Sequence, residues 1–222
     1  MAQQIRENLW QVGGDGLTGG GDAAAYLIRI GDQAALIDAG TGSRHKRLAA
    51  NIEACLPSEV SLTYLILTHC HFDHTGGAAA VRAAFNCRIV AHALDAVYLE
   101  AGESDVTAAS WYGSTMEPLA VDIKLEGDRC VIPVGTGELT AIHWPGHSPG
   151  SLVVTVRLGS ELVLFGQDVH GPIHPALLSD MSAYQASLQR ILDLDADLLL
   201  EGHYGIIEGR GPVQDFIRSF ML

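Results

Sequence analysis

Hydrophobic and polar positions along the chain form two successive blocks, each with strand-like and then helical segments. In the first block, residues 23–40 hold two apolar runs that meet at Gly31-Asp32, a pair typical of a hairpin turn. Two shorter runs, residues 62–69 and 87–92, are almost fully apolar, which predicts strands buried on both faces. Helical spacing covers residues 43–56, 75–85 and 93–102.

The second block opens with further strand-like segments in residues 121–128, 137–146, 151–159 and 160–166. Helices are predicted over 180–194 and 211–222, with a strand over 196–203 between them. Residues 102–120 show no clean period, which predicts a loop or lid with some helix. Strands and helices do not alternate strictly, so layer rules favour an α/β protein of the four-layer αββα sandwich type, with residues 1–222 as one domain.

Charge and composition narrow the range of partners. The formal net charge is −13 and only 13 basic residues are present, so binding of nucleic acid through its phosphates is not expected. No apolar run reaches the roughly 18 residues of a membrane span, and the N-terminus lacks the pattern of a signal peptide. The four cysteines show no C-x-x-C spacing and are expected to be reduced thiols of a cytoplasmic protein. The apolar C-terminal end leaves a homo-oligomer open.

The stretch LILTHCHFDHTGG, residues 65–77, concentrates the candidate chemistry. It holds His69, His71, Asp73 and His74 directly after a predicted strand. On an extended segment residues i and i+2 point the same way, so His69 and His71 can converge on one metal ion. If the chain turns after Phe72, Asp73 and His74 can serve a second ion. Imidazole and carboxylate are the usual ligands of zinc and of non-haem iron.

Three later residues can complete such sites. His147 lies in a turn bounded by proline and glycine, and Asp168 and His203 each follow a predicted strand. By analogy with open α/β sheets, binding groups gather where strands end. Seven ligands over two ions leave room for a bridging hydroxide and a substrate atom.

Five motifs in this order resemble the metallo-β-lactamase superfamily: LIDAG, THCHFDHTGG, PGHSPGS, LFGQD and EGHYG. The resemblance extends from Asp38 to His203 and implies the αββα fold. It also implies that one metal ion is held by His69, His71 and His147, and the other by Asp73, His74 and His203. Asp168 would bridge the two ions, and Asp38 would orient a ligand histidine through its free ring N–H.

The resemblance implies a hydrolase with two divalent metal ions, of which zinc is favoured, with iron or manganese as alternatives. A metal-bridging hydroxide would attack the substrate, and Asp73 would orient it and transfer its proton. An aspartate at the bridging position is more similar to the glyoxalase II, lactonase and thioesterase-like branch, which predicts a small thioester, ester or lactone as substrate. One alternative is a mononuclear iron oxidoreductase similar to persulfide dioxygenases. A weaker one is a metal-binding protein without catalysis.

Substrate contacts are predicted from position alone. His170 follows Asp168 and is expected to face the pocket, where it would replace the tyrosine that similar lactonases carry nearby. Trp111 and Tyr112 are aromatic residues that can line the pocket mouth, or else anchor their loop. The acidic charge of the chain disfavours attraction of strongly anionic ligands, so a neutral or weakly charged small molecule is expected.

Overall fold

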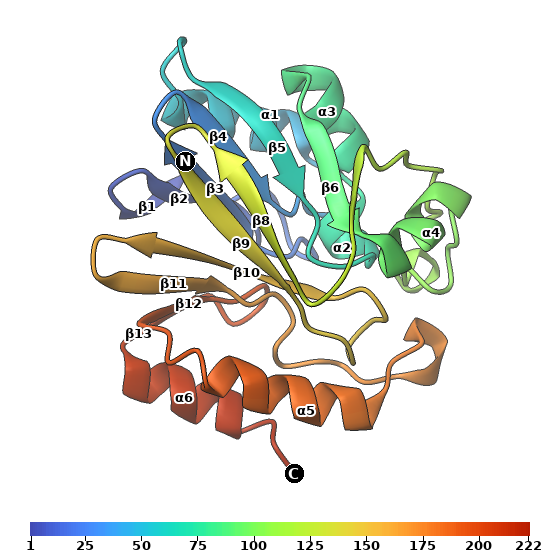
Figure 1. The fold of residues 1–222 in the computed structure, drawn as a ribbon. Helices are drawn as coiled ribbons and strands as arrows, with labels where there is room; N and C mark the ends of the chain where they lie inside the picture. Colours follow the sequence, from blue (N-terminus) through green and yellow to red (C-terminus); the bar gives the residue numbers. More distant parts are fainter.

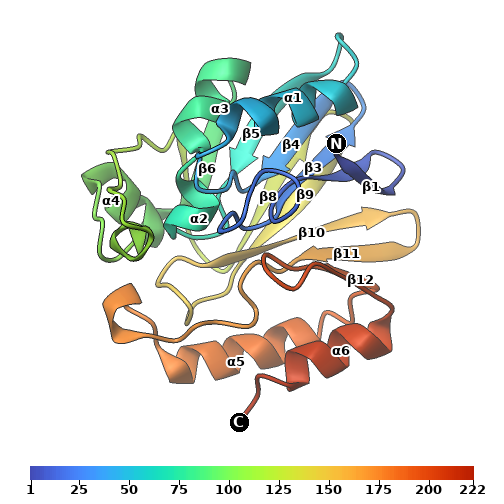
Figure 2. The same cartoon turned by 180° about the vertical axis from the view of Figure 1, so that it is seen from behind.

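Two β-sheets lie face to face and helices cover their outer sides (Figures 1 and 2). The computed structural model describes residues 1–222. The first sheet runs in the order β1 (Gln3–Arg6), β2 (Leu9–Gly13), β3 (Ala25–Ile30), β4 (Gln33–Ile37), β5 (Ser61–Ile66), β6 (Arg88–His92) and β7 (Ile123–Leu125). Its first four strands pair antiparallel and its last four pair parallel.

The second sheet is mostly antiparallel. Its order is β13 (Ile206–Glu208), β12 (Leu198–Leu200), β11 (Glu161–Phe165), β10 (Leu152–Leu158), β9 (Gly137–His143) and β8 (Arg129–Val134). Only β11 and β12 pair parallel, since the connection between them contains a helix. No helix of the structure combines the length and apolar character that crossing a membrane requires.

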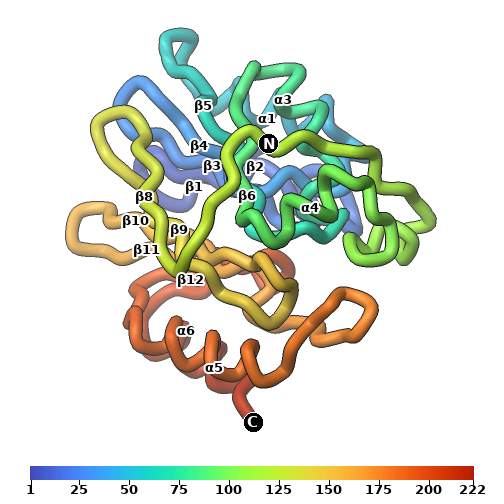
Figure 3. Tube along the Cα trace, turned by 45° about the vertical axis from the view of Figure 1, so that its right-hand side comes forward, coloured from blue at the N-terminus to red at the C-terminus, as the bar shows by residue number.

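Helices complete the outer layers on both sides of the sheets (Figure 3). On the side of the first sheet lie α1 (His45–Cys55), α3 (Ala78–Phe85) and α4 (Ala93–Ala101), with the short α2 (Phe72–Thr75) and η1 (Ala109–Tyr112). On the side of the second sheet lie α5 (Met181–Leu192) and α6 (Arg210–Arg218), preceded by η2 (Pro175–Leu177). The predicted αββα sandwich is therefore confirmed.

Three layers of buried apolar side chains hold these four layers together. The central one lies between the sheets and contains Tyr26 and Phe165, whose rings are 6.0 Å apart. A second layer fills the space beneath α1 and α3, and a third, with Trp144, lies beneath α5 and α6. Each sheet buries one face against the other sheet and its opposite face against helices, so three apolar interfaces separate the four layers.

Most predicted elements are present, but those around the histidine cluster are shorter than predicted. The strand predicted over 62–69 ends at Ile66, and the helix predicted over 75–85 begins at Ala78. Between these two elements the backbone makes hydrogen bonds to neighbouring loops in place of the β-sheet hydrogen bonds. Ala39 N donates to His74 O (2.7 Å), and Phe72 N donates to Thr107 O (2.7 Å). Within residues 102–120 the structure has a single helical turn, η1, in agreement with the prediction.

Gly77 sets how closely this segment packs against the loop after β4. A Cβ atom at Gly77 would lie 2.2 Å from Ala39 O, although its φ of −82° suits any residue. We expect Gly77→Ala to lower the free energy of unfolding by about 1–3 kcal/mol, because the backbone of a packed segment must move. Urea denaturation measures the change. Gly211→Ala is the matched control, because no atom lies within 4 Å of its added Cβ and the expected change is below ~0.5 kcal/mol.

Two stacked histidines join the ends of the sheets. His92 ends β6 and His143 ends β9, and their ring centroids are 4.0 Å apart at an interplanar angle of 5°. His143 Nε2 donates to Pro149 O (2.9 Å), and His92 Nδ1 accepts from Leu94 N (3.3 Å) at the start of α4. Burial, together with His143, lowers the pKa of His92 to about 4. His143 and His92 therefore pack against each other at the ends of the two sheets.

This pair makes stability depend on pH. The unfolded chain binds a proton at His92 near its ordinary pKa of 6.5, whereas the folded chain binds it only near 4. Stability is therefore lost as pH falls from about 6.5 towards 4. We expect the stability advantage of wild type over His92→Asn, which retains a helix-capping acceptor, to shrink by about 1–2 kcal/mol between pH 7 and pH 5. Urea denaturation at both pH values tests this, and a constant difference would contradict it.

Candidate metal centre

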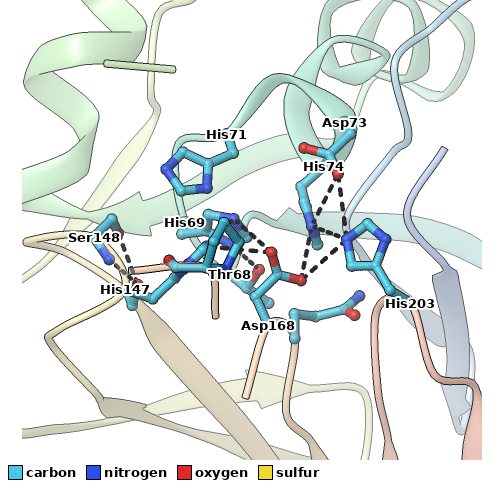
Figure 4. A network of polar contacts seen from close by, with 12 residues as sticks. Thr68, His69, His71, Asp73, His74, His147, Ser148, Asp168 and His203 are labelled. Atoms are coloured by element: carbon cyan, nitrogen blue, oxygen red, sulfur yellow. Dashed lines mark hydrogen bonds and ion pairs between the residues drawn. The ribbon is translucent and has the colours of Figure 1, made fainter. Parts of the chain in front are cut away.

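Imidazole and carboxylate groups from distant segments meet where strands of both sheets end (Figure 4). They come from the turn after β5, from α2, and from the loops that follow β9, β11 and β12. The residues are His69, His71, Asp73, His74, His147, Asp168 and His203. The structure thus brings together all seven residues that the sequence proposed as ligands.

The donor atoms fall into two groups. The first group is His69, His71, His147 and Asp168, and the second group is Asp73, His74 and His203. Within each group the candidate atoms all lie within 4.8 Å of one another. This division matches the one implied by the family resemblance. It follows from local structure, because the extended backbone at His71 ends where α2 begins and turns the next two side chains towards the second group.

Asp168 stands between the two groups. Its Oδ2 atom is 3.2 Å from His147 Nε2 and 3.7 Å from His69 Nε2. Its Oδ1 atom is 3.2 Å from both His74 Nε2 and His203 Nε2. The residue has a φ of +57°, a conformation that aspartate tolerates better than most side chains. Each carboxylate oxygen therefore faces one group, which is the geometry expected of a bridging ligand.

Several polar atoms of the centre have no adequate partner within the protein. His71 Nε2 and Asp168 Oδ1 are buried without a hydrogen bond. His69 Nε2 lies 3.3 Å from His147 Nε2, and His74 Nε2 lies 3.3 Å from His203 Nε2. Buried polar groups left unpaired are costly, and ring nitrogens facing one another cannot all be satisfied by hydrogen bonds. A cation in each group would satisfy them, and this donor set fits zinc or iron.

Hydrogen bonds on the far side of the rings fix which nitrogen faces the centre. Asp38, fully buried, accepts from His74 Nδ1 (2.8 Å) and from Thr68 Oγ1 (2.8 Å). Because Thr68 Oγ1 donates to Asp38, it accepts from His69 Nδ1 at 3.0 Å. His147 Nδ1 donates to Pro172 O (2.8 Å). These bonds use the Nδ1 atoms, so Nε2 of His69, His74 and His147 faces the centre, and Asp38 makes the orienting contact that the family resemblance implies.

Electrostatics of the centre suits cation binding. Burial holds the pKa values of His69 and His71 well below 6.5, which favours the neutral imidazole that binds metals. Burial opposes ionisation of Asp168, but the surrounding imidazoles, led by His74, hold its pKa well below its usual range. Burial lowers the pKa of His203, yet Asp168 and Asp73 outweigh it and raise the value to about 10. The carboxylates also raise the pKa of His74 well above 6.5, so the second group favours positive charge, which a bound cation would supply in place of these protons.

Two cavities flank the glycine-rich loop before β3. One, of about 520 Å³, is lined by Gly20, Gly21, Thr41, Gly42, Ser43, Phe72, Tyr112, Gly113 and Ser114. The other, of about 480 Å³, is lined by Gln11, Asp15, Gly20, Gly21, Asp22, Ala24, Gly202, His203, Tyr204 and Gly205. Neither wall contains a lysine or an arginine.

The residues proposed to contact substrate take different positions. Tyr112 lines the larger cavity, its ring 5.9 Å from that of Phe72, whereas Trp111 is exposed and packs against His174. His170 Nδ1 lies 2.7 Å from Glu201 Oε1, and its ring lies beside His203, with centroids 5.2 Å apart. His170 is therefore next to the centre and held by a buried carboxylate.

Glu201 and Asp95 are two buried carboxylates near the centre that the sequence patterns did not indicate. Glu201 is fully buried and accepts from His203 N (2.7 Å) and Tyr204 N (3.0 Å). It directly follows β12, so the same strand-end criterion that selected His203 would have selected it. Asp95 has no comparable signal, because it lies inside a predicted helix and its partners are distant in sequence.

Comparison with known proteins supports the fold and identifies the family. A family profile described as the metallo-beta-lactamase superfamily matches residues 18–203. The chain belongs to the metallo-β-lactamase superfamily. This membership confirms the expected family. The structure of a metallo-β-lactamase, MIM-1, from Novosphingobium pentaromativorans superposes with a TM-score of 0.79, covering 99% of this chain and 86% of that one at 22% identity. That likeness supports the fold.

Curated relatives carry hydrolase names. A probable metallo-hydrolase of Bacillus subtilis is 32% identical over 88% of this chain and 88% of its own length. A bovine acyl-coenzyme A thioesterase is 29% identical over 83% of this chain and 74% of its own length. The chain spans 59% and 60% of the lengths of two further relatives, from Drosophila melanogaster and Methanocaldococcus jannaschii.

Proposed function

We propose that this protein is a dinuclear metal-dependent hydrolase that cleaves a small thioester, ester or lactone. The observation that carries the proposal is the position of Asp168, with one carboxylate oxygen facing each group of ligands. A single ion would leave one of these oxygens, and the nitrogens around it, without a partner.

The ligands would divide as the two groups do. The first ion would be held by His69, His71 and His147. The second ion would be held by Asp73, His74 and His203. Asp168 would contribute a ligand to both ions. Histidine and carboxylate ligands favour zinc, and the oxygen bridge also suits iron or manganese. When bound, such a pair of cations lowers the pKa of a water molecule between them and polarises a substrate carbonyl group.

Residues of the chain itself supply orientation and proton transfer. The Asp73 carboxylate directs Oδ2 towards His203 Nε2 (3.3 Å) and His74 Nε2 (3.7 Å) at the edge of the second group. It is the carboxylate we assign to orienting the nucleophilic water and accepting its proton. Burial and the nearby Asp73 raise the pKa of Tyr112, so its hydroxyl keeps its proton and can donate a hydrogen bond to the substrate.

The cavities and the relatives support the proposed substrate class. Walls of glycine, hydroxyl groups and aromatic rings without lysine or arginine favour a small neutral acyl group over a polyanionic one. The acyl-coenzyme A thioesterase among the relatives supports a thioester as the bond that is cleaved, and the cavity walls favour a thiol leaving group less charged than coenzyme A. Cleavage of a small uncharged ligand also agrees with the net charge of −13, which repels anions.

A substrate panel tests the proposal. Purified protein is assayed on short-chain thioesters, aryl esters and lactones, before and after removal of metal by a chelator and after zinc is added back. We expect hydrolysis of at least one class, loss of that activity on chelation, and its recovery with zinc. Hydrolysis that survives complete metal removal, or no hydrolysis of any class by the metal-loaded protein, would overturn the proposal.

Tyr112 provides a test of the larger cavity as the substrate site. We expect Tyr112→Phe to raise KM by about 3–10-fold with little change in kcat. A rise in KM of this size corresponds to the loss of one hydrogen bond between the protein and the bound substrate. Steady-state kinetics on the best substrate of the panel measures both constants. Tyr98→Phe, in α4 and outside the cavity, is the matched control. Unchanged constants in Tyr112→Phe would remove this cavity from the proposal.

A further inference from the structure

Asp95 is a fully buried carboxylate that connects two loops of the centre. It is the third residue of α4, a helix that supplies no candidate ligand. Its Oδ2 atom accepts hydrogen bonds from Cys70 N (2.9 Å) and Ser148 Oγ (2.6 Å), and its Oδ1 atom accepts from Gly150 N (2.6 Å). All three hydrogen bonds cross between segments that are far apart in the sequence.

The donors lie at particular places relative to the first group. Cys70 is the residue between His69 and His71, and its N–H belongs to the peptide bond that follows His69. This hydrogen bond therefore holds the segment that carries the two candidate ligands. Ser148 directly follows His147. One carboxylate therefore ties the segment carrying His69 and His71 to the loop carrying His147.

Packing around Asp95 leaves little room for another arrangement. A Cβ atom at Gly150 would lie 2.5 Å from Asp95 N and 2.8 Å from Asp95 Cγ, so only glycine lets the loop approach α4 so closely. Ser148 Oγ, which donates to Asp95, lies 2.7 Å from Ser151 Oγ and accepts its proton. Ser151 Oγ in turn accepts from Ser148 N (3.0 Å). The loop from His147 to Ser151 is thus fixed by a closed set of hydrogen bonds that ends on Asp95.

The charge of Asp95 has no basic partner. No lysine, arginine or histidine forms an ion pair with it, and burial raises its pKa while the bonds from Ser148 and Gly150 oppose that rise. A buried carboxylate is costly unless donors satisfy it, and here three donors do so. Its hydrogen bonds reach segments of the first group and none of the second.

We propose that Asp95 is a positioning residue for the first metal ion, an inference that rests on the proposed metal centre. Its carboxylate fixes the distance between the His69–His71 segment and His147, and thereby sets the affinity of the first group. It touches neither the ion nor the substrate. Asp38 has a different place, because it contacts His74 of the second group directly.

The test is titration of metal-free protein with cobalt(II), followed by its visible absorption. Wild type is expected to show two binding steps. His147→Ala and His203→Ala identify which step belongs to the first group and which to the second. In Asp95→Asn an amide NH₂ group replaces one of the two carboxylate oxygens. This group cannot accept a hydrogen bond, so at least one of the N–H or O–H donors around Asp95 loses its partner. We expect it to weaken the first-group step by about 10–100-fold and to leave the second within about 3-fold.

Two further variants separate positioning from general destabilisation. Ser148→Ala removes one of the three donors, and we expect a smaller shift of the same step. Asn51→Ala is the matched control: Asn51 is also buried, and its side chain donates to Val12 O (2.8 Å) far from the centre. We expect it to lower the melting temperature of metal-free protein without shifting either cobalt step.

The outcomes are distinguishable from failure of the proposed function. Wild-type affinities in both Asp95→Asn and Ser148→Ala, or equal weakening of both steps, would overturn the positioning role of Asp95 and leave the hydrolase proposal intact. Absence of cobalt binding in wild type would overturn both. Two normal cobalt steps in a protein that hydrolyses nothing would overturn the hydrolase alone, and selective weakening in Asp95→Asn would still support Asp95 as the positioning residue.

Discussion

Replacement of Asp168 by asparagine is expected to lower the metal content below two ions per chain and to reduce kcat/KM by at least ~10³-fold, about 4 kcal/mol of transition-state stabilisation. The reason is that each oxygen of Asp168 faces a different group, and an amide offers only one oxygen ligand. Asparagine is chosen because it tolerates the φ of +57° at this position, so backbone strain does not obscure the result.

Metal analysis and steady-state kinetics on the same preparation measure the effect of Asp168→Asn. Asp215→Asn is the control, because the Asp215 side chain is exposed on α6, where its carboxylate pairs with Arg218. Full metal content together with full activity in Asp168→Asn would show that the two groups do not share a bridging ligand.

Replacement of Asp73 by asparagine is the second large effect. Asp73 belongs only to the second group, so we expect Asp73→Asn to keep the ion of the first group and to lose affinity for the second. Because the variant also loses the proton acceptor, kcat should fall by about 10²–10⁴-fold while KM changes little. Kinetics and the cobalt titration measure both parts.

The contrast between these variants tests the division of roles. Loss of both ions in Asp73→Asn would contradict the assignment of Asp73 to one group. A fall in KM with unchanged kcat would contradict its role in proton transfer. Asp105→Asn, at an exposed position between α4 and η1, controls for loss of a carboxylate elsewhere on the same side of the first sheet.

Sequence alone predicted the fold layers and the position of the centre. Apolar runs such as residues 62–69 and 160–166 are recognisable as strands because burial on two faces leaves little room for polar residues. His147, Asp168 and His203 were identifiable because each follows such a run, and structure places all three at one edge. The family profile confirmed the resemblance on which the division into two groups was based.

Other features depend on contacts that no local pattern records. The edge strand β8 carries alternating exposed and buried residues with Pro133 among them, a weak strand signal. Asp95 and Glu201 act through backbone N–H groups from distant loops, and backbone donors have no sequence signature. The cavity at Tyr112 forms between the loop before β3 and the turn η1, which lie about 90 residues apart. The single-domain organisation of residues 1–222 and the oligomeric state stay predictions.

We propose that the two groups of ligands hold two metal ions. Elemental analysis of protein purified without added metal or chelator, expressed as ions per chain, tests it most directly. We expect about two ions per chain, mainly zinc, with iron or manganese as the alternatives. No bound metal would contradict it. One iron per chain, with oxygen uptake on a persulfide, would also contradict it and would assign the protein to the oxidoreductases.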